Sequence, residues 1–242
     1  MNEYPYNYEE TSVDRESGFR DYIRSVFVQM ALGLLLTAAL AFACYQSILT
    51  RGLVYRIIVS MPFIPIVLIV AELAVALTMS FAFRKLSSTM VQVLFYAYAA
   101  ITGISFSVIF LAYDIGTVFL AFVISAVFFG CMAFIGYRTE KDLSGFGPYL
   151  IAGLIATIVV SIIGIIFRIQ MLDMVIAYIG LALFIGLTAY DMQKVKRLYF
   201  SGELEEEDAK KLGTYGAMEL YLDFINIFLK VLRILGNRRS NN

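Results

Sequence analysis

The sequence predicts an all-α membrane protein. Of its 242 residues, 60% are hydrophobic and only 16% are charged, whereas soluble domains are about 45–50% apolar and about 25% charged. Mean hydropathy is +0.80. A compact domain of this size in water needs a polar surface that this composition cannot supply. The excess apolar surface must therefore face lipid, so we expect a chain that crosses the membrane several times.

Six apolar runs are long enough to span the membrane, because a spanning helix needs about 20 residues at 1.5 Å each. Pro62 and Pro65 lie in the first turns of the second run, where proline is tolerated in a helix. A break around Tyr113, Asp114 and Gly116 separates the third run from the fourth and predicts a tight helical hairpin. The runs lie near residues 26–49, 57–83, 90–113, 115–137, 149–168 and 174–193.

A last run, at about 217–235, is apolar on one side only. Its polar residues recur at spacings of four, three, four and three, which places on one helix face Glu219, Asp223, Asn226, Lys230 and Arg233. Two interpretations remain open from the residues alone. The run is either an amphipathic helix on the membrane surface or a seventh spanning helix whose polar stripe faces the bundle interior, away from lipid.

The ends and loops of the chain predict its domains and its orientation. Residues 1–24 form an acidic tail that lacks the basic start and apolar core of a secretory signal. Residues 25–236 form the transmembrane domain and 237–242 a C-terminal tail. With seven spans, Lys and Arg concentrate in the loops on the N-terminal side, so we expect a cytoplasmic N-terminus and an external C-terminus. The acidic stretch 201–216 is expected to be a solvated loop with a short helix.

The chain contains no histidine. This removes the commonest zinc and haem ligand and every Ser-His or Cys-His nucleophile, so we expect neither a cofactor nor an enzyme. It also removes the side chain that normally changes charge near neutral pH. Basic and acidic residues balance to a net charge of zero, which gives no basic surplus for a nucleic-acid partner.

Ionisable residues at membrane depth are the candidate functional residues. Arg84 ends the second predicted helix on its cytoplasmic side, Asp191 lies near the cytoplasmic end of the sixth, and Asp223 lies about two turns into the seventh. These three form a lower level of charge. Glu72 and Arg233 lie about 15–18 Å higher by helical rise, at a depth that suits an intramembrane ion pair.

The lower level predicts a proton switch. Two aspartates that lie close together in a low-dielectric site cannot both ionise cheaply, so Asp191 and Asp223 would share a proton as a coupled pair, while a nearby Arg84 would favour their charged forms. Without histidine, these three residues must carry any response to pH. Carboxylate oxygens also suit Ca²⁺, and a path lined with them favours cations. Asp191 and Asp223 are therefore the expected sites of transient Ca²⁺ contacts.

Four stretches resemble the Bax inhibitor-1 family, also called the transmembrane Bax-inhibitor-motif family, in its bacterial form. They are FVQMALGLLLTAALAF, ELAVALTMSFAFRKLS, GLALFIGLTAYDMQKVK and ELYLDFINIFLKVLRILG. The resemblance implies seven spanning helices, arranged as two three-helix layers around a central C-terminal helix. It also implies a pH-sensitive calcium leak with a hydrogen-bonded pair, Asp191 and Asp223, an arginine latch at Arg84, and a second ionic contact between Glu72 and Arg233.

We therefore expect a pH-sensitive calcium or cation leak channel in the plasma membrane, with Ca²⁺ as the permeant ion and the lipid bilayer as its partner. Two other classes stay open. A membrane interaction protein that modulates a protease or a cell-death or stress regulator would co-purify with a protein partner and give no flux. A proton-coupled transporter would use the same carboxylates and show saturable counter-flow uptake of a small solute.

Overall fold

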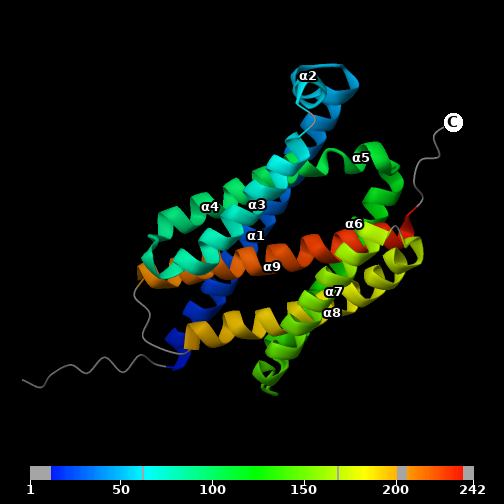
Figure 1. Cartoon of the computed structure of the whole chain (residues 1–242). Coiled ribbons are helices and arrows are strands. Elements are labelled where there is room, and N and C mark those ends of the chain that lie inside the picture. Colours follow the sequence, from blue (N-terminus) through cyan, green and yellow to red (C-terminus); the bar gives the residue numbers. More distant parts are fainter. Residues whose placement is uncertain (1–11, 62, 168, 201–205, 237–242) are drawn as a thin grey trace, which may run out of the picture.

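The computed structural model describes residues 12–61, 63–167, 169–200 and 206–236. Every regular element in these ranges is a helix (Figure 1). The elements are α1 (Ser12–Leu49), α2 (Leu53–Ser60), α3 (Ile64–Ala82), η1 (Phe83–Lys85), α4 (Ser88–Phe106), α5 (Ile109–Ala112), α6 (Ile115–Arg138), η2 (Ser144–Phe146), α7 (Gly147–Phe167), α8 (Gln170–Phe200) and α9 (Glu206–Leu235).

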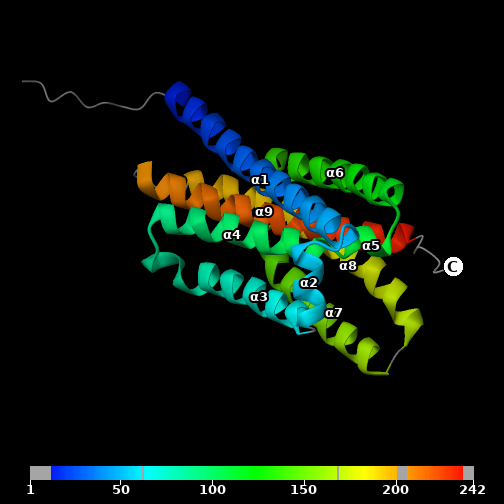
Figure 2. The ribbon, with the colours of Figure 1, turned by 90° about the horizontal axis from the view of Figure 1, so that it is seen from above.

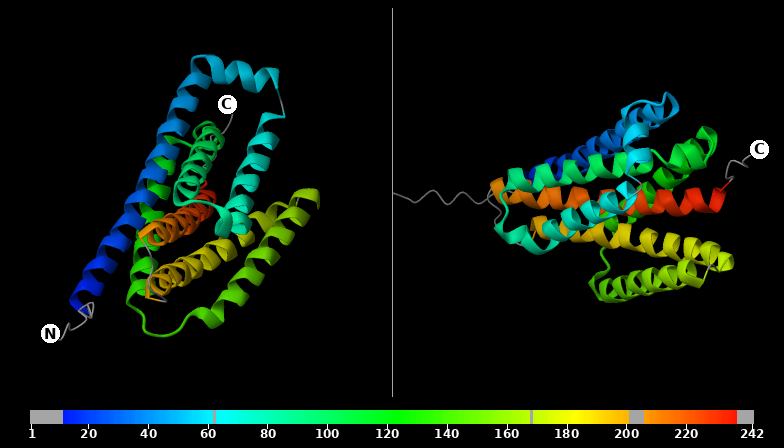
Figure 3. Two further views of the ribbon diagram at one scale, coloured as in Figure 1. Left: turned by 90° about the vertical axis from the view of Figure 1, so that its left-hand side faces the viewer. Right: turned by 45° about the horizontal axis from the view of Figure 1, so that its top comes forward.

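Two layers of three long helices enclose α9 (Figure 3). One layer contains α1, α3 and α4, and the other contains α6, α7 and α8. The central helix α9 packs against α1 and α4 on one side and against α6 and α8 on the other. Figure 2 shows α3 on the outer side of α4. The predicted arrangement of two layers around a central C-terminal helix is therefore confirmed.

Within the described ranges, six helices are long and apolar enough to cross a membrane, and they correspond to the six predicted runs. The helix α9 is the further element, and it is the most enclosed of the seven. Its Leu220, Tyr221 and Ile227 side chains are fully buried. Because α9 lies in the centre of the bundle, the alternative of an amphipathic helix on the membrane surface is wrong.

Close approaches of backbone join neighbouring helices within each layer. A Cβ atom at Gly103 of α4 would lie 2.8 Å from the carbonyl oxygen of Thr37 in α1. A Cβ at Gly136 of α6 would collide with the carbonyl oxygen of Ala189 in α8. Small residues therefore allow these helices to touch backbone to backbone, as helices in lipid often do.

The helix starts differ from the predicted ones in two places. The first helix begins at Ser12, inside the predicted tail, and its Phe19 and Tyr22 side chains are buried in the bundle. The predicted span 57–83 is instead two helices, α2 and α3, because proline disfavours a helical conformation in the preceding residue and Pro65 fits only the first turn. The predicted tail 237–242 lies outside the described residues.

The connections at the other predicted boundaries also have physical causes. Asp114 caps α6, and its Oδ1 accepts a 2.9 Å hydrogen bond from the Thr117 backbone N–H. The Thr117 hydroxyl also donates to Asp114, and these two hydrogen bonds, the hydroxyl one having the larger effect, hold the pKa of Asp114 below its usual range.

The predicted hairpin is wrong as a packed pair, because α4 packs on α1, α3 and α9 while α6 packs on α8 and α9. Most of the predicted acidic loop 201–216 is the first part of α9, and residues 201–205 lie outside the described ranges.

Candidate functional site

The polar stripe of α9 lies against α8 along most of its length. The two helices run antiparallel and form the most extensive helix pair in the bundle. We call their polar contact the seam. It contains Glu219, Asp223, Asn226, Lys230 and Arg233 from α9, and Asp173, Gly180, Thr188, Asp191 and Lys194 from α8. Helical spacing explains the α9 members, since each follows the last by three or four residues.

Asp191 and Asp223 meet in the seam, as the sequence predicted. Their carboxyl groups lie within hydrogen-bonding reach of each other, and the Thr188 hydroxyl lies within reach of Asp223. Asp223 is only 3% exposed, and Thr188 is fully buried. The Oδ2 atom of Asp223 is buried without a well-aligned hydrogen bond among the described residues. The arrangement therefore holds two acids together where water has little access.

An ion pair that the sequence analysis did not single out lies one helical turn away. Lys194 Nζ lies 2.5 Å from Glu219 Oε1, and it also lies 5.5 Å from the centre of the Tyr215 ring. Lys194 is also the cation beside Asp191. Its spacing of three residues from Asp191 on one helix is the signal that could have identified it.

A second buried oxygen, Oε2 of Glu219, lies at the level of this ion pair. Glu219 Oε2 has no hydrogen-bond partner among the described residues, and neither does the Tyr22 hydroxyl of α1, which lies beside Glu219. Buried polar atoms usually have a partner. The concentration of oxygen atoms here distinguishes this end of the seam from the apolar core around it.

The opposite end of the seam is more open. Lys230 packs its aliphatic stem over Gly180, where a Cβ atom would lie 2.7 Å from Lys230 Cε. Asn226 donates a 2.8 Å hydrogen bond to the Leu222 carbonyl of its own helix. Arg233 Nη1 lies 3.9 Å from Asp173 Oδ1, and both side chains are about half exposed.

The predicted latch at Arg84 is not formed in this structure. Arg84 lies in the single turn η1, is exposed, and takes part in no ion pair between described residues. The turn itself meets α9 through the neighbouring residue, because the Phe83 ring packs against Tyr215 and lies 4.9 Å from Lys211 Nζ. The Arg84 side chain lies exposed instead.

The predicted ion pair between Glu72 and Arg233 is also wrong. Glu72 Oε1 accepts a 2.8 Å hydrogen bond from the Ser105 hydroxyl of α4, whereas Arg233 pairs with Asp173 of α8. The depth estimate alone could not distinguish these partners. Because α4 stands between α3 and α9, residues at similar depth lie on different sides of a helix.

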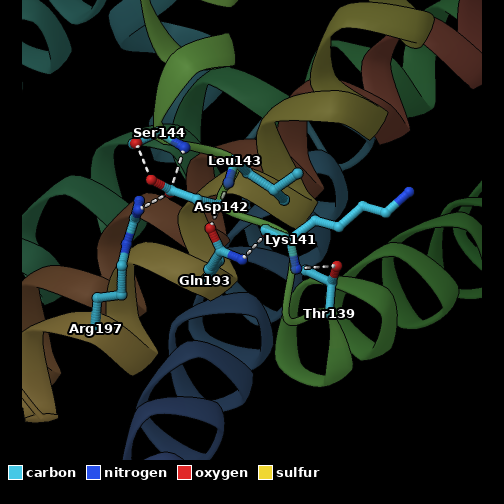
Figure 4. Close-up of polar contacts among 7 residues, drawn as sticks. All are labelled: Thr139, Lys141, Asp142, Leu143, Ser144, Gln193 and Arg197. Atoms are coloured by element: carbon cyan, nitrogen blue, oxygen red, sulfur yellow. Dashed lines mark hydrogen bonds and ion pairs between the residues drawn. The ribbon is translucent and has the colours of Figure 1, made fainter.

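A loop clamp holds the α6–α7 connection against α8 at the N-terminal end of the bundle (Figure 4). The buried Gln193 accepts a 2.8 Å hydrogen bond from the Leu143 backbone N–H and donates one of 2.8 Å to the Lys141 carbonyl. Arg197 forms an ion pair with Asp142. Since Gln193 lies between Asp191 and Lys194 in sequence, the clamp fixes the segment of α8 that carries them.

Asp142 orders the clamp through several hydrogen bonds. The Ser144 hydroxyl donates a 2.7 Å hydrogen bond to Asp142 Oδ2, and the Ser144 backbone N–H donates one of 2.9 Å to Oδ1. These bonds, followed by the charge of Arg197, hold the pKa of Asp142 below its usual range. The sequence analysis missed this cluster, because its members are common loop residues.

The described residues contain no group of three or more acidic or thiol side chains arranged to hold a metal ion. Asp191 and Asp223 provide hard oxygen ligands, but a stable Ca²⁺ site usually needs six to eight such atoms. The two carboxyl groups together provide at most four oxygen atoms.

Comparison with known proteins gives a consistent result. The family described as "Inhibitor of apoptosis-promoting Bax1" matches residues 19–240. The inner membrane protein YbhL of Escherichia coli (strain K12) is 39% identical over 230 residues, which cover 94% of this chain and 96% of that protein. An uncharacterized protein of Borreliella burgdorferi is 36% identical over 91% of this chain and 93% of its own length. Protein RP147 of Rickettsia prowazekii is 35% identical, over 93% of each chain.

Proposed function

Since the chain belongs to the Bax inhibitor-1 family and is a multi-pass membrane protein, we propose that it forms a calcium-permeable leak through the plasma membrane, controlled by protons at Asp191 and Asp223. The observation that carries this proposal is the meeting of the two carboxyl groups in the seam between α8 and α9. Lys194 and Glu219 act beside them as the neighbouring ion pair.

The chemistry follows from the position of the pair. Two carboxyl groups in contact at low dielectric compete for ionisation, so one shared proton is the low-energy arrangement. Loss of that proton adds a negative charge at the contact between two helices. Repulsion between Asp191 and Asp223 then favours separation of α8 and α9, and the exposed carboxylates attract a cation. The unpartnered oxygens of Asp223 and Glu219 support this role, because they are available to a cation that passes along the seam.

A flux assay tests the proposal. The purified protein would be reconstituted in vesicles, and Ca²⁺ flux would be measured across pH for the parent protein, Asp191→Asn and Asp223→Asn. We expect the parental pH profile to flatten in both variants, because neither keeps two titratable acids. Asp208→Asn is the matched control, since Asp208 is an exposed acid in the first turn of α9 that lies outside the seam.

Three results of this assay contradict the proposal. Retention of the parental pH profile in both pair variants means that the aspartates are not the switch. A parent protein that gives no flux but co-purifies with one stable partner indicates an interaction protein. Saturable counter-flow of a small solute indicates a proton-coupled transporter.

The proposal includes an orientation, with the N-terminus in the cytoplasm and the C-terminus outside. The bias of Lys and Arg toward the loops on the N-terminal side supports it. Single cysteines introduced at Lys141, in the α6–α7 loop, and at Arg51, in the α1–α2 connection, test it in a background without Cys44 and Cys131. In intact cells a membrane-impermeant thiol reagent should label position 51 and not position 141, and the reverse pattern refutes the orientation.

A further inference from the structure

A second intramembrane acid lies apart from the seam. Glu72 is near the middle of the 19-residue helix α3, at least about 12 Å from either helix end by helical rise. Most of α3 faces lipid, but Glu72 lies on the face that packs against α4, together with the buried Met79. A charged carboxylate at this depth is costly unless a proton, a cation or a set of donors compensates it.

The helix α4 presents a row of hydroxyl groups to Glu72. Tyr98, Thr102 and Ser105 follow one another at spacings of four and three, which places them on one face. The Ser105 hydroxyl donates a 2.8 Å hydrogen bond to Glu72 Oε1. Thr102 is only 2% exposed and lies within hydrogen-bonding reach of Glu72, Tyr98 and Tyr221. Its hydroxyl nevertheless makes no well-aligned hydrogen bond with any described residue.

The row continues into the centre of the bundle. The hydroxyl of the fully buried Tyr221 lies 2.7 Å from that of Thr37 in α1. Thr37 donates its single hydroxyl hydrogen to the Ala99 carbonyl, at 2.8 Å, so Tyr221 must be the donor to Thr37. The oxygen of Tyr221 is then left to accept a hydrogen bond, and Thr102 is placed to donate it.

We propose that Glu72, with Ser105, Thr102 and Tyr221, forms a proton-binding site distinct from the aspartate pair. A protonated Glu72 donates its O–H to Thr102, and the hydrogen bonds then run in one direction through Tyr221 and Thr37 to the Ala99 carbonyl. Ser105 donates to the other carboxyl oxygen. The hydroxyls of Thr102, Tyr221 and Thr37 then each donate and accept one hydrogen bond. An ionised Glu72 has no hydrogen to give, so Thr102 would turn its own O–H to the carboxylate and Tyr221 would lose its donor.

The charges around Glu72 support a proton as the ligand. On α4, the element packed against α3, the titratable group that faces Glu72 is Tyr98, and behind it lies Tyr221 of α9. No ion pair between described residues includes Glu72. Tyr221 and Asp223 are two positions apart on α9, so they point to nearly opposite sides of that helix. The hydroxyl chain and the seam therefore lie on different sides of α9.

A hydrophobic carbodiimide tests the site, because it reacts from the lipid phase with a protonated carboxyl group and leaves a stable N-acylurea. The full-length protein in lipid vesicles would be treated between pH 6 and 10, and the label on Glu72 would be measured by peptide mass spectrometry. We expect Glu72 to be labelled at neutral pH and the label to decline as the pH rises. Glu72→Gln provides the blank.

Two variants should move the midpoint of this decline in opposite directions. Thr102→Val removes the acceptor of the acid O–H and should lower the midpoint, whereas Ser105→Ala removes a donor to the carboxylate and should raise it. One hydrogen bond corresponds to about half a pH unit to one unit. Thr157→Val and Ser161→Ala are matched controls, because their hydroxyls bond only to the backbone of α7.

Several outcomes overturn the proposal. Glu72 that stays unlabelled at neutral pH is not a protonated acid, and labelling that does not change between pH 6 and 10 is not a titration. If the midpoints in the Thr102 and Ser105 variants shift no more than those in the controls, the hydroxyl chain does not contribute to the site. Suppression by sodium at constant pH identifies a metal-cation site instead. An altered profile in Asp223→Asn makes Glu72 part of the aspartate switch.

Discussion

The central helix α9 meets two polar regions of opposite kinds. Toward α8, acids and bases lie together, with Lys194 paired to Glu219 beside the two aspartates. Toward α4, Tyr221 meets a chain of hydroxyls that ends at one acid, Glu72. The seam therefore balances charge with charge, while the hydroxyl chain has no charge of opposite sign to balance its acid.

This difference determines how each region can respond to a proton. In the seam, a change in protonation alters the attraction between two helices, because the charged groups belong to both α8 and α9. At Glu72, protonation alters the charge of one side chain and the direction of a hydrogen-bond chain. The seam is thus suited to move helices, and the hydroxyl chain is suited to hold a proton within a fixed contact.

The connections between helices are held in different ways. The α6–α7 loop is tied to α8 through Gln193 and Arg197. In the turn between α3 and α4, Ser87 caps α4 by accepting a 3.3 Å hydrogen bond from the Met90 N–H. We expect substitutions in the seam to have larger effects on folding than substitutions at Glu72, because an unpaired buried charge costs more than an unpaired hydroxyl.

The largest effect should follow from Lys194→Met. The substitution leaves Glu219 and the aspartates without their neighbouring cation, and loss of one partner of a buried ion pair costs about 3–5 kcal/mol. Since Lys194 is one-third exposed and Glu219 is 17% exposed, we expect a loss of about 2–3 kcal/mol. The measurement is the free energy of unfolding, from denaturant titration in detergent.

Two further variants sharpen this result. Lys194→Met combined with Glu219→Leu should regain much of the lost stability, because an ion pair replaced as a whole by apolar groups is often neutral. Arg84→Met should change the free energy of unfolding by no more than about 0.5 kcal/mol, as is usual for an exposed residue. A loss of stability in Arg84→Met as large as that in Lys194→Met would support the predicted latch at Arg84.

The next effect should follow from Gln193→Leu. The variant leaves the Leu143 N–H and the Lys141 carbonyl without their side-chain partner, and two hydrogen bonds are together worth about 2 kcal/mol. Because the contact is local, we expect faster amide exchange and faster proteolysis in residues 139–146. Gln92→Leu, at an exposed position of α4, is the control. Equal protease sensitivity in the two variants would mean that Gln193 does not hold the loop.

Much of this architecture is predictable from sequence, because the patterns that predict it lie within single helices. The apolar runs predict the spans, and the helical spacing of Glu219 and Asp223 predicts the polar face of α9. The sequence predicts only that Asp191 and Asp223 lie at a similar depth, and their pairing is what the resemblance to the family implies. The bounds of α2 and α3 follow from proline chemistry once Pro62 and Pro65 are treated as a helix break.

The side-chain partners were less predictable, because depth along a helix does not determine lateral position. Glu72 and Arg233 lie at comparable depth, yet α4 stands between their helices. Arg84 lies near the predicted level of the aspartates, but α3 packs on the outer face of α4. The clamp at Gln193 joins residues 50 or more positions apart in sequence, and no spacing rule identifies such a contact.

A smaller effect is expected from Glu72→Gln, in contrast to Glu219→Gln. If Glu72 is protonated, the amide keeps its shape and its capacity to donate to Thr102. The free energy of unfolding should then change by less than about 0.5 kcal/mol, whereas Glu219→Gln should cost about 2 kcal/mol because it removes the carboxylate that contacts Lys194 directly. Denaturant titration of both variants makes the comparison. A Glu72→Gln loss as large as that of Glu219→Gln would show that Glu72 is charged.

The smallest effect concerns the pH dependence of the loop clamp. The pKa of Asp142 in the folded protein lies below the ordinary value of 3.8 because of its hydrogen bonds with Ser144 and the charge of Arg197. The ionised form is therefore the one that the fold favours. Its contribution is complete above the unfolded pKa and is lost as the pH falls through the lower folded pKa.

Amide exchange of Leu143 and Ser144, corrected for intrinsic rates, measures this dependence between about pH 2.5 and 6. We expect constant protection from pH 6 down to about pH 4 and a loss below it. Asp142→Asn should remove the dependence. Asp114→Asn should leave it unchanged, because Asp114 has a similarly lowered pKa but caps α6 far along the chain from the clamp. A parental protection profile in Asp142→Asn would assign the acid response to another group, and the seam aspartates would be the next to test, since Gln193 lies on the same turn of α8 as Asp191.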